Sequence, residues 1–341
     1  MEDRKAALLE FSDTLDRILQ GKAKGEAERA LAEELEVAVH RNPWFTPSQM
    51  RISLSSLREM LQREAIDRWV APYEKAFRNE MLQCRSVLLI MAGNIPFVGV
   101  QDVLAVLLSG HNALIKASSK DDRSLPRLLE LLESFPAFSG RVRLREGPVG
   151  TPDAVIATGS DNTGRYFSYY FGHLPHTFRG NRSGVAVLKG DEDEAELKGL
   201  LRDVCLYFGR GCRNVTKLYV PDDWDPSALL DLTDTEEELK EHQKYMNNYA
   251  YHKAIYLMNG ERFYDGGSLL LKADSDVNSP LGTLFYEAYR SKEELEQLLN
   301  RDRDRIQCLV GRDHIPFGKA QFPDLGEHEA EKDPLDLLAG I

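Results

Sequence analysis

The chain has 341 residues, of which 42% are hydrophobic and 29% are charged, and its formal net charge at pH 7 is −12. This length fits about two globular domains, and the acidic balance argues against a general nucleic-acid binder or a protein that coats anionic membranes. The longest apolar run, residues 98–108, contains Gln101 and Asp102 and is too short to span a bilayer. The charged first residues lack a signal-peptide core, and four cysteines without an evident pairing suit a reducing compartment. We therefore expect a cytoplasmic protein without a membrane span and without a nucleic-acid partner.

The first quarter of the chain predicts helices. Apolar residues recur at three- and four-residue spacing over residues 8–19, 27–38 and 54–70. A glycine-containing break separates the first two helices, and Thr46 or Ser48 is a suitable cap for the third. No residue in this region suggests chemistry.

From residue 84 onward, strands and helices alternate, and polar residues follow the strand ends. Alternation of this kind predicts a parallel, doubly wound sheet, in which ligands bind beyond the carboxyl ends of the strands. The predicted strands of this first series are 87–91, 113–116, 141–144 and 154–157, and the predicted helices are 98–108 and 125–132.

A second alternating series begins near residue 184. Its charged stretch at 222–251 is helix-prone, and the polar residues 327–341 are expected to be loosely ordered. The predicted strands are 185–188, 216–220 and 306–310, with one helix leading toward residue 212 and another at 293–299.

One cysteine lies in an unusual setting. Residues 208–214 read Phe-Gly-Arg-Gly-Cys-Arg-Asn, which places Cys212 on a glycine-rich loop between two arginines. Fixed positive charge beside a thiol favours the thiolate, the nucleophilic form. Cys84, Cys205 and Cys308 adjoin or lie within apolar segments and are interpreted as buried, inert thiols. No cysteine pair has metal-ligand or CxxC spacing, so we expect no metal site; that Cys212 is also inert stays an open alternative.

The common nucleotide-binding glycine motifs, GxGxxG after a strand and GxxxxGK[ST], are absent. Other segments occur in a recognisable order: MAGNIPFVGVQD, LLSGHNALIKASSKD, ATGSDNTGRYFSYYFG, YFGRGCRNVTKLYVP and Pro-Phe-Gly at 316–318. Over residues 45–320 they resemble the acyl-CoA reductase family of the aldehyde dehydrogenase superfamily, and the fatty-acid reductase component of bacterial luminescence systems in particular. The resemblance implies an α/β, aldehyde dehydrogenase-like fold with two doubly wound lobes and an N-terminal helical region.

The resemblance also implies roles for individual residues. Cys212 would take the acyl group, and the side-chain amide of Asn94 would stabilise the oxyanion together with the backbone N–H of Cys212. Lys116 would contact the ribose and phosphate region of the cofactor, and a small-residue turn would approach its pyrophosphate. Each residue has an alternative interpretation as a turn, cap or solvent-exposed residue. The other residues expected at the cofactor are Ser118, Ser119, Thr158, Gly159, Ser160, Pro316 and Phe317.

Two departures from the superfamily pattern sharpen the expected chemistry. Hydrolytic aldehyde dehydrogenases carry a glutamate before a Gly-Gly turn, whereas residues 177–182 here read Thr-Phe-Arg-Gly-Asn-Arg, so the base that activates water is missing. Ser119 stands where an acidic residue often binds the adenosine ribose, and serine beside lysine would accept a 2′-phosphate, which favours NADPH. Arg179 and Arg182 are candidates to hold a CoA phosphate, and His176 is a candidate proton donor. The alternatives are surface ion pairs for the arginines and a structural histidine.

Together these inferences predict NADPH-dependent reduction of a fatty acyl-CoA, or another acyl thioester, to the aldehyde through an acyl-cysteine at Cys212. The alternatives are an NAD(P)-dependent aldehyde dehydrogenase that makes free acid, an acyl-phosphate reductase, and a non-catalytic scaffold subunit of an acyl-transfer complex. Expected partners are an acyl-CoA or acyl-protein donor, an acyl-activating ligase and further copies of the chain in a homo-oligomer. The expected parts are N-terminal helices with an NADP-binding domain (1–188), a catalytic domain (189–314) and a C-terminal return segment (315–341).

Overall fold

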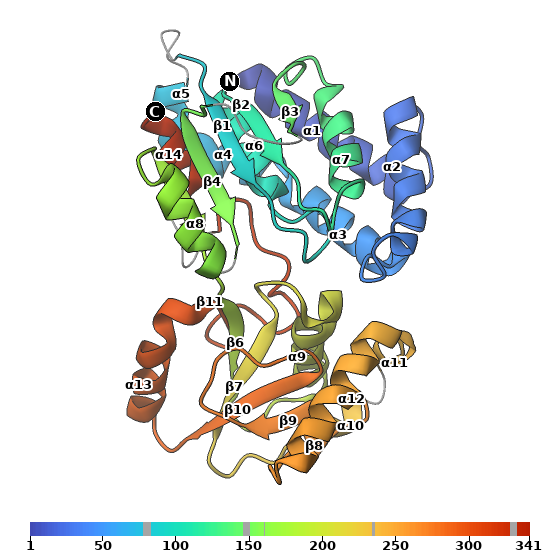
Figure 1. Ribbon diagram of the computed structural model, residues 1–341, viewed down its shortest axis with the longest axis vertical. Helices are drawn as coiled ribbons and strands as arrows, with labels where there is room; N and C mark the ends of the chain where they lie inside the picture. The colour runs from blue at the N-terminus through green and yellow to red at the C-terminus, as the bar shows by residue number, and fades with distance from the viewer. Residues whose placement is uncertain (78–82, 146–150, 160, 234–235, 328–332) are drawn as a thin grey trace. The chain divides into compact units, whose positions relative to one another are not determined.

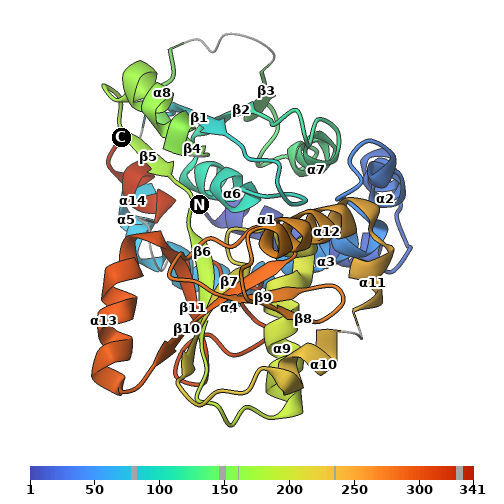
Figure 2. The ribbon, with the colours of Figure 1, turned by 60° about the horizontal axis from the view of Figure 1, so that its bottom comes forward.

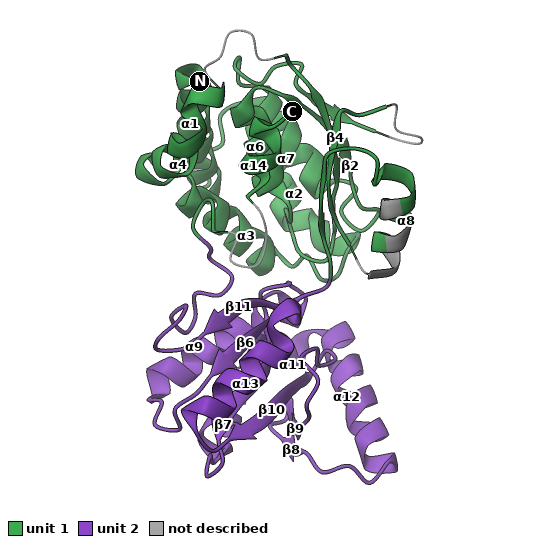
Figure 3. Ribbon diagram, turned by 90° about the vertical axis from the view of Figure 1, so that its left-hand side faces the viewer, with its two compact units in different colours: residues 1–180, 324–341 green, residues 181–323 purple. Residues whose placement is uncertain are grey.

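The computed structural model describes residues 1–77, 83–145, 151–159, 161–233, 236–327 and 333–341. The chain divides into two compact units, unit 1 with residues 1–180 and 324–341 and unit 2 with residues 181–323 (Figure 1 and Figure 3). Each unit contains one largely parallel sheet with helices, which is the α/β class expected from the sequence. The division at residues 188 and 314 remains a prediction, and β6 (Ser183–Val187) lies in unit 2 because its ladder partners are there.

Unit 1 is built on a five-stranded, fully parallel sheet with the order β3-β2-β1-β4-β5. The chain runs outward from β1 to β3 and then returns to β4 on the other side of β1. The strand order therefore reverses between β1 and β4, which is the usual ligand position in such sheets. The four strands predicted here are confirmed; β5 is not among them, because its four residues form no apolar run. The elements are β1 (Ser86–Ile90), α6 (Val100–Ser109), β2 (Asn112–Lys116), α7 (Ser124–Glu133), β3 (Val142–Leu144), β4 (Ala154–Thr158), α8 (Asp161–Phe171) and β5 (His176–Arg179).

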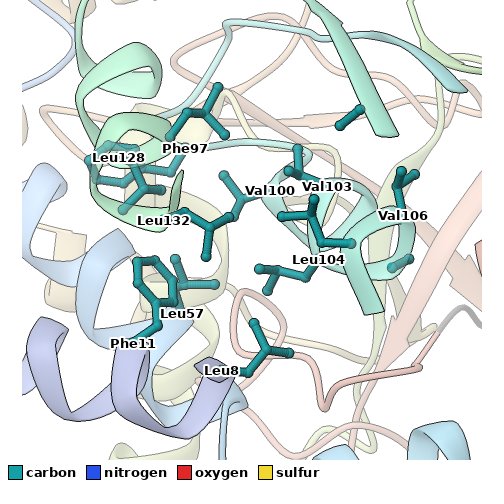
Figure 4. Packing of buried hydrophobic residues seen from close by; sticks show 14 of the residues in the cluster. Leu8, Phe11, Leu57, Phe97, Val100, Val103, Leu104, Val106, Leu128 and Leu132 are labelled. Carbon is teal, nitrogen blue, oxygen red and sulfur yellow. The ribbon is translucent and has the colours of Figure 1, made fainter. Parts of the chain in front are cut away.

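The predicted N-terminal helices are confirmed and pack in unit 1. Thr46 caps the third of them, since its hydroxyl accepts a hydrogen bond from the backbone N–H of Gln49 at 3.3 Å. Val103 and Leu104 of α6 share one buried cluster with Leu8 of α1, which anchors these helices to the sheet's connecting helix (Figure 4). The helices are α1 (Glu2–Leu19), α2 (Glu26–Val37), α3 (Pro47–Met60), α4 (Arg63–Val70) and α5 (Glu74–Phe77), with 3-10 turns at Ala38–His40 and Ala71–Tyr73.

The expectation that residues 327–341 are loosely ordered is wrong for their last part. Residues 333–341 contain α14 (Pro334–Ala339), whose Leu335 and Leu338 are fully buried and which packs against α6. The Trp69 indole N–H also donates to the carboxylate of Asp333 at 2.8 Å. Its apolar residues span less than two helical turns and carry little periodic signal, so the order of this short segment comes from packing.

Unit 2 contains a six-stranded sheet with the order β11-β6-β7-β10-β9-β8, parallel except at its edge strand β8. Helices α9 and α13 lie on opposite sides of this sheet (Figure 2). The three predicted strands are confirmed as β6, β7 and β11, while β8, β9 and β10 are additional strands. Within the described part of the chain, no helix has the length and apolarity needed to cross a membrane. The remaining elements are α9 (Glu194–Cys205), β7 (Val215–Pro221), α10 (Ser227–Thr233), α11 (Glu237–Glu241), α12 (Gln243–Met258), β8 (Tyr264–Asp265), β9 (Leu270–Ala273), β10 (Thr283–Tyr289), α13 (Lys292–Asp302) and β11 (Ile306–Val310), with 3-10 turns at Leu206–Gly209 and Arg303–Arg305.

Candidate active site

The loop that carries Cys212 follows α9 in unit 2 and leads into the amino end of β7. In the 3-10 turn between α9 and the loop, Tyr207 and Phe208 have φ angles of 53° and 57°. Left-handed backbone at two consecutive buried aromatic residues is strained and persists only where the surrounding packing imposes it. The Phe208 ring packs on His242, with ring centroids 4.1 Å apart. Cys212 is exposed, so its thiol is accessible.

Asn214 fixes this loop to the end of α9. Its side chain is fully buried, and its amide oxygen accepts a hydrogen bond from the backbone N–H of Gly211 at 2.6 Å. Its amide nitrogen donates to the carbonyl oxygens of Asp203, Val204 and Leu206 at 2.8, 3.1 and 2.9 Å. These carbonyls lie where a helix ends and lacks intrahelical donors. One side chain therefore ties the helix end to the residue before Cys212.

The two arginines that flank Cys212 are both substantially buried. The Nε of Arg213 donates to the carbonyl oxygen of Ala320 at 2.5 Å. Burial lowers the pKa of Arg210 to about 10, which still leaves its guanidinium charged at neutral pH. Two guanidinium groups therefore flank Cys212 along the chain, and that of Arg213 is fixed by its hydrogen bond to a backbone carbonyl. That they favour the Cys212 thiolate stays a prediction.

The other cysteines differ in exposure. Cys205 and Cys308 are buried, as predicted, and burial raises the pKa of the Cys205 thiol. Cys84 is exposed, so the prediction that it is a buried thiol is wrong; it precedes β1 and does not share the burial of that strand. Among the described residues, no group of three or more histidine, cysteine, aspartate or glutamate side chains is arranged to hold a metal ion.

A second segment of unit 2, residues 316–321, packs on α9. The carboxylate of Asp203 accepts hydrogen bonds from the backbone N–H groups of Gly318 and Ala320 at 2.7 and 2.9 Å. Burial raises the pKa of Asp203 to about 6, although both amides favour the charged form. A Cβ at Gly199 would lie 2.9 Å from the backbone of Phe317, so this glycine permits the close approach. Helix α9 therefore positions both the Cys212 loop and a segment predicted to contact the cofactor.

In unit 1, several predicted cofactor residues gather at the carboxyl edge of the sheet. Lys116 ends β2, is exposed, and lies in register with the last residue of β1. Thr158 ends β4 in register with Arg179 of β5, and the Arg179 carbonyl accepts a hydrogen bond from the N–H of Gly159 at 3.1 Å. Asn94 follows β1 in a half-buried turn. These residues meet where the strand order reverses.

The loops after β1 and β2 touch at this edge. A Cβ at Gly93 would lie 2.7 Å from the side chain of Ser118, so the missing side chain lets the two loops meet. Ser119 is exposed beside it. Ser160 lies outside the described residues, and Pro316 is exposed on unit 2.

A buried carboxylate supports the turn that carries Asn94. Phe97, three residues later, has a φ angle of 56°, and its backbone N–H bonds to the carboxylate of Asp121. Asp121 also accepts from the N–H of Leu125 at 2.9 Å, which caps α7. Burial raises the pKa of Asp121 to about 6. Asp121 therefore holds a strained turn in place from the neighbouring loop.

Of the three residues considered for substrate contact, Arg179 and His176 lie at opposite ends of β5 in unit 1, and Arg182 belongs to unit 2. Arg179 forms a largely buried ion pair with Asp102 of α6, with Nη1 and Oδ2 2.5 Å apart. His176 lies at the opposite, amino end of β5, and its Nδ1 is 2.8 Å from the carbonyl oxygen of Leu174. Arg182 is half-buried at the start of unit 2. The fold thus brings Arg179 to the edge described above and leaves His176 away from it.

The carboxyl edge of unit 1 fits a dinucleotide cofactor. It presents the amino ends of α6 and α8, where helices favour phosphate, together with the exposed cation of Lys116. Gly159 follows β4 without a side chain to obstruct a pyrophosphate, and Ser119 offers a hydroxyl. Lys116, Ser118, Ser119, Thr158 and Gly159 would hold the cofactor there.

Sequence reasoning missed the residues that position the site. Asn214, Asp203 and Asp121 each bind two or more backbone groups while buried. For Asp203 a signal exists, because a charged residue that interrupts an apolar helical stripe is either exposed or bonded. For the contact of Asp121 with Phe97 no local signal exists, since Phe97 lies on another loop.

Three comparisons place the chain among known proteins. No protein-family model matches it. Solved structures with a similar fold include aldehyde dehydrogenase 21 from Physcomitrella patens in complex with succinate (TM-score 0.64, 11% identity, 98% of this chain and 84% of that chain). Another is the Mycobacterium tuberculosis aldehyde dehydrogenase complexed with NAD+ (0.60, 15%, 86% and 71%). A third is the NADP-dependent glyceraldehyde-3-phosphate dehydrogenase from Bacillus halodurans complexed with NADP (0.62, 16%, 91% and 73%). The chain therefore has the aldehyde dehydrogenase fold.

The chain is also similar in sequence to individual enzymes of known class. The chain is 23% identical to long-chain acyl-protein thioester reductase 2 of Photobacterium leiognathi over 47% of this chain and 37% of that protein. It is 23% identical to the corresponding reductase of Aliivibrio fischeri over 52% and 40%. It is also 28% identical to N-succinylglutamate 5-semialdehyde dehydrogenase 2 of Caulobacter vibrioides over 38% and 30%. The chain thus matches well under half the length of these relatives, and the resemblance to luminescence-type acyl thioester reductases is confirmed.

Proposed function

We propose that this chain reduces an acyl thioester, with a long-chain acyl-CoA as the leading donor, to the aldehyde, and that Cys212 carries the acyl group. The observation that supports this most directly is an exposed cysteine on a loop fixed by Asn214, within an aldehyde dehydrogenase fold. A second support is that residues 177–179, where hydrolytic relatives would need a glutamate, form part of strand β5 and supply no carboxylate.

The chemistry assigned to the chain begins at the sulfur of Cys212. This sulfur attacks the carbonyl carbon of the thioester, a new C–S bond forms, and the bond to the departing thiol breaks, so that the thiol leaves with a proton from solvent. The side-chain amide of Asn94 and the backbone N–H of Cys212 are assigned to the oxyanion, where one such donor is worth about 3 kcal/mol. Bound NADPH would supply the hydride that reduces the carbonyl carbon. The sulfur of Cys212 is then released as the aldehyde forms.

The decisive experiment is intact-protein mass spectrometry after incubation with an acyl-CoA and without NADPH. We expect one acyl mass on the unmodified chain, none on Cys212→Ala, and the full adduct on Cys84→Ala, since Cys84 is the other exposed thiol. Because residues 177–182 contain no glutamate that could activate water, the adduct should persist until NADPH is added. An adduct that survives Cys212→Ala would end the proposal, as would the absence of any adduct.

NADPH rather than NADH is proposed because the exposed Ser119, with Lys120 beside it, stands where an acidic residue would repel a 2′-phosphate. Substitution Ser119→Asp should raise KM for NADPH about tenfold or more while KM for NADH changes little, a factor that corresponds to about 1.4 kcal/mol. Equal changes for the two cofactors would contradict this assignment.

An acid-forming aldehyde dehydrogenase is the second candidate, because the chain is also similar to a semialdehyde dehydrogenase. It predicts formation of free acid from an aldehyde with NAD(P)+ and without CoA. An acyl-phosphate reductase predicts NADPH oxidation with acyl phosphates but not with CoA thioesters. A non-catalytic scaffold subunit predicts no NADPH oxidation with any donor.

The partners of this chain are also proposed. An acyl-CoA or acyl-protein donor and an acyl-activating ligase would supply the thioester, and the chain would act as a homo-oligomer. Light scattering of the purified protein, alone and with a candidate ligase, measures both associations.

A further inference from the structure

A cavity in unit 1 lies apart from the carboxyl edge of the sheet. It has a volume of about 520 Å³, within the range of small-molecule sites. Its walls come from the start of α1, the end of α6 and the residues before β1 and β3, which are elements at the amino end of this sheet (Figure 1). The lining residues used below are Arg4, Cys84, Gly110, Ser139 and Arg141.

Two guanidinium groups converge in this cavity on one glycine. The Nη1 of Arg141 donates to the carbonyl oxygen of Gly110 at 2.8 Å. The Nη1 of Arg4 occupies the space that a Cβ of Gly110 would need, and its Nη2 donates to the carbonyl oxygen of Phe77 at 3.3 Å. Gly110 ends α6 with a φ angle of 94°, so both its backbone conformation and its surroundings require glycine. The two cations are therefore held together by the fold.

Among the described residues that line the cavity, the charges of the two arginines are not balanced. Among the residues that the structure describes, no carboxylate lies within 4.0 Å of either guanidinium. Burial lowers the pKa of Arg4, and the charge of Arg141 lowers it further. Asp3 lines the same cavity at an exposed position, so the described lining residues, with two arginines and one aspartate, carry a net positive charge. An anion between the two guanidiniums would relieve this repulsion.

We propose that this cavity binds a phosphorylated small molecule, with its phosphoryl group between Arg4 and Arg141. A phosphoryl dianion matches two positive charges, and its three oxygens accept the paired N–H donors that a guanidinium presents. The hydroxyl of Ser139 on the cavity wall is a further donor. The site does not depend on the proposed reduction, because it shares no residue with the cofactor edge or with the Cys212 loop.

The exposed Cys84 provides a reporter for this site. It lies in the cavity wall with its sulfur 3.9 Å from the Nη1 of Arg141. In a Cys212→Ser background it is the one exposed thiol, because Cys205 and Cys308 are buried. The test measures the rate of Cys84 alkylation by iodoacetamide in the folded full chain, by intact mass, with and without inorganic pyrophosphate at constant ionic strength.

Pyrophosphate is expected to slow the alkylation, because only the unoccupied fraction reacts. At ten times the Kd that fraction is about one eleventh. Inorganic phosphate should act in the same way at higher concentration, and succinate should act much more weakly. Substitution Lys116→Ala should leave the protection intact, which separates this cavity from the cofactor edge.

The variants Arg4→Gln and Arg141→Gln should each remove the protection, measured as the ratio of rates with and without pyrophosphate. Arg143→Gln, two residues along β3 and exposed, should retain it. Using two arginine variants keeps the test decisive if one fails to fold. Unchanged alkylation in pyrophosphate, protection that persists in both arginine variants, or equal protection by succinate would overturn the proposal.

Discussion

Replacing Asn214 by alanine should loosen unit 2 around the Cys212 loop. The substitution leaves three buried carbonyl oxygens without their side-chain donor and the N–H of Gly211 without its acceptor. A buried polar group left unsatisfied costs about 1–3 kcal/mol, and water that enters the vacated space recovers part of it. Because Asn214 has two N–H groups for three carbonyls, we expect a total loss of about 3 kcal/mol in the free energy of unfolding. This corresponds to an increase of about 150-fold in the opening equilibrium.

Hydrogen exchange followed by mass spectrometry measures the opening equilibrium of each strand in the Asn214→Ala variant. Exchange of the β7 amides, at residues 215–221, should become about 100-fold faster or more, while exchange in β1 of unit 1 stays unchanged. The matched control is Asn259→Ala, because Asn259 is exposed and its side chain bonds only to the carboxylate of Glu261, at 3.0 Å. If β7 exchanged at the same rate in both variants, the assignment of Asn214 as the anchor of this loop would be refuted.

Further predictions concern the buried charges and the C-terminal helix. Burial raises the pKa of Asp203 to about 6 from 3.8, so its contribution to stability is complete below about pH 4 and is lost as the pH rises through 6. Between pH 4 and pH 7, the free energy of unfolding of Asp203→Asn, measured in urea, should therefore rise by about 2–3 kcal/mol relative to that of the unmodified chain. A difference between the two chains that is the same at both pH values would contradict this. Lys217 is fully buried between two carboxylates, so Lys217→Met should cost about 3 kcal/mol, whereas Lys198→Met at an exposed pair should cost less than about 0.5 kcal/mol in the same assay. Leu335→Ala should destabilise unit 1 by about 2–4 kcal/mol and Leu337→Ala by clearly less, and equal thermal shifts would show that α14 is not part of the core.

Much of the architecture is predictable from local patterns. Apolar residues at helical spacing and short apolar runs predicted most of the helices and strands of both sheets, because burial of one face imposes a period on the sequence. The accessible Cys212 was also predictable, since a loop with two glycines between arginines is a poor candidate for a hydrophobic core. Four strands, β5, β8, β9 and β10, were not predicted. The case of β5 shows the reason, because it is held by ladder hydrogen bonds to β4 while its own residues form no apolar run.

The tertiary structure alone decided how the candidate residues are held. Asp121 reaches the turn of Asn94 from a neighbouring loop, and Asp203 binds amides more than a hundred residues further along the chain. The approach of Arg4 and Arg141 to Gly110 and the burial of α14 also depend on contacts between residues far apart in the sequence. A period in the sequence reports only which side of an element is buried. Which distant groups meet there depends on the path of the whole chain, and so the site's supports became visible only in three dimensions.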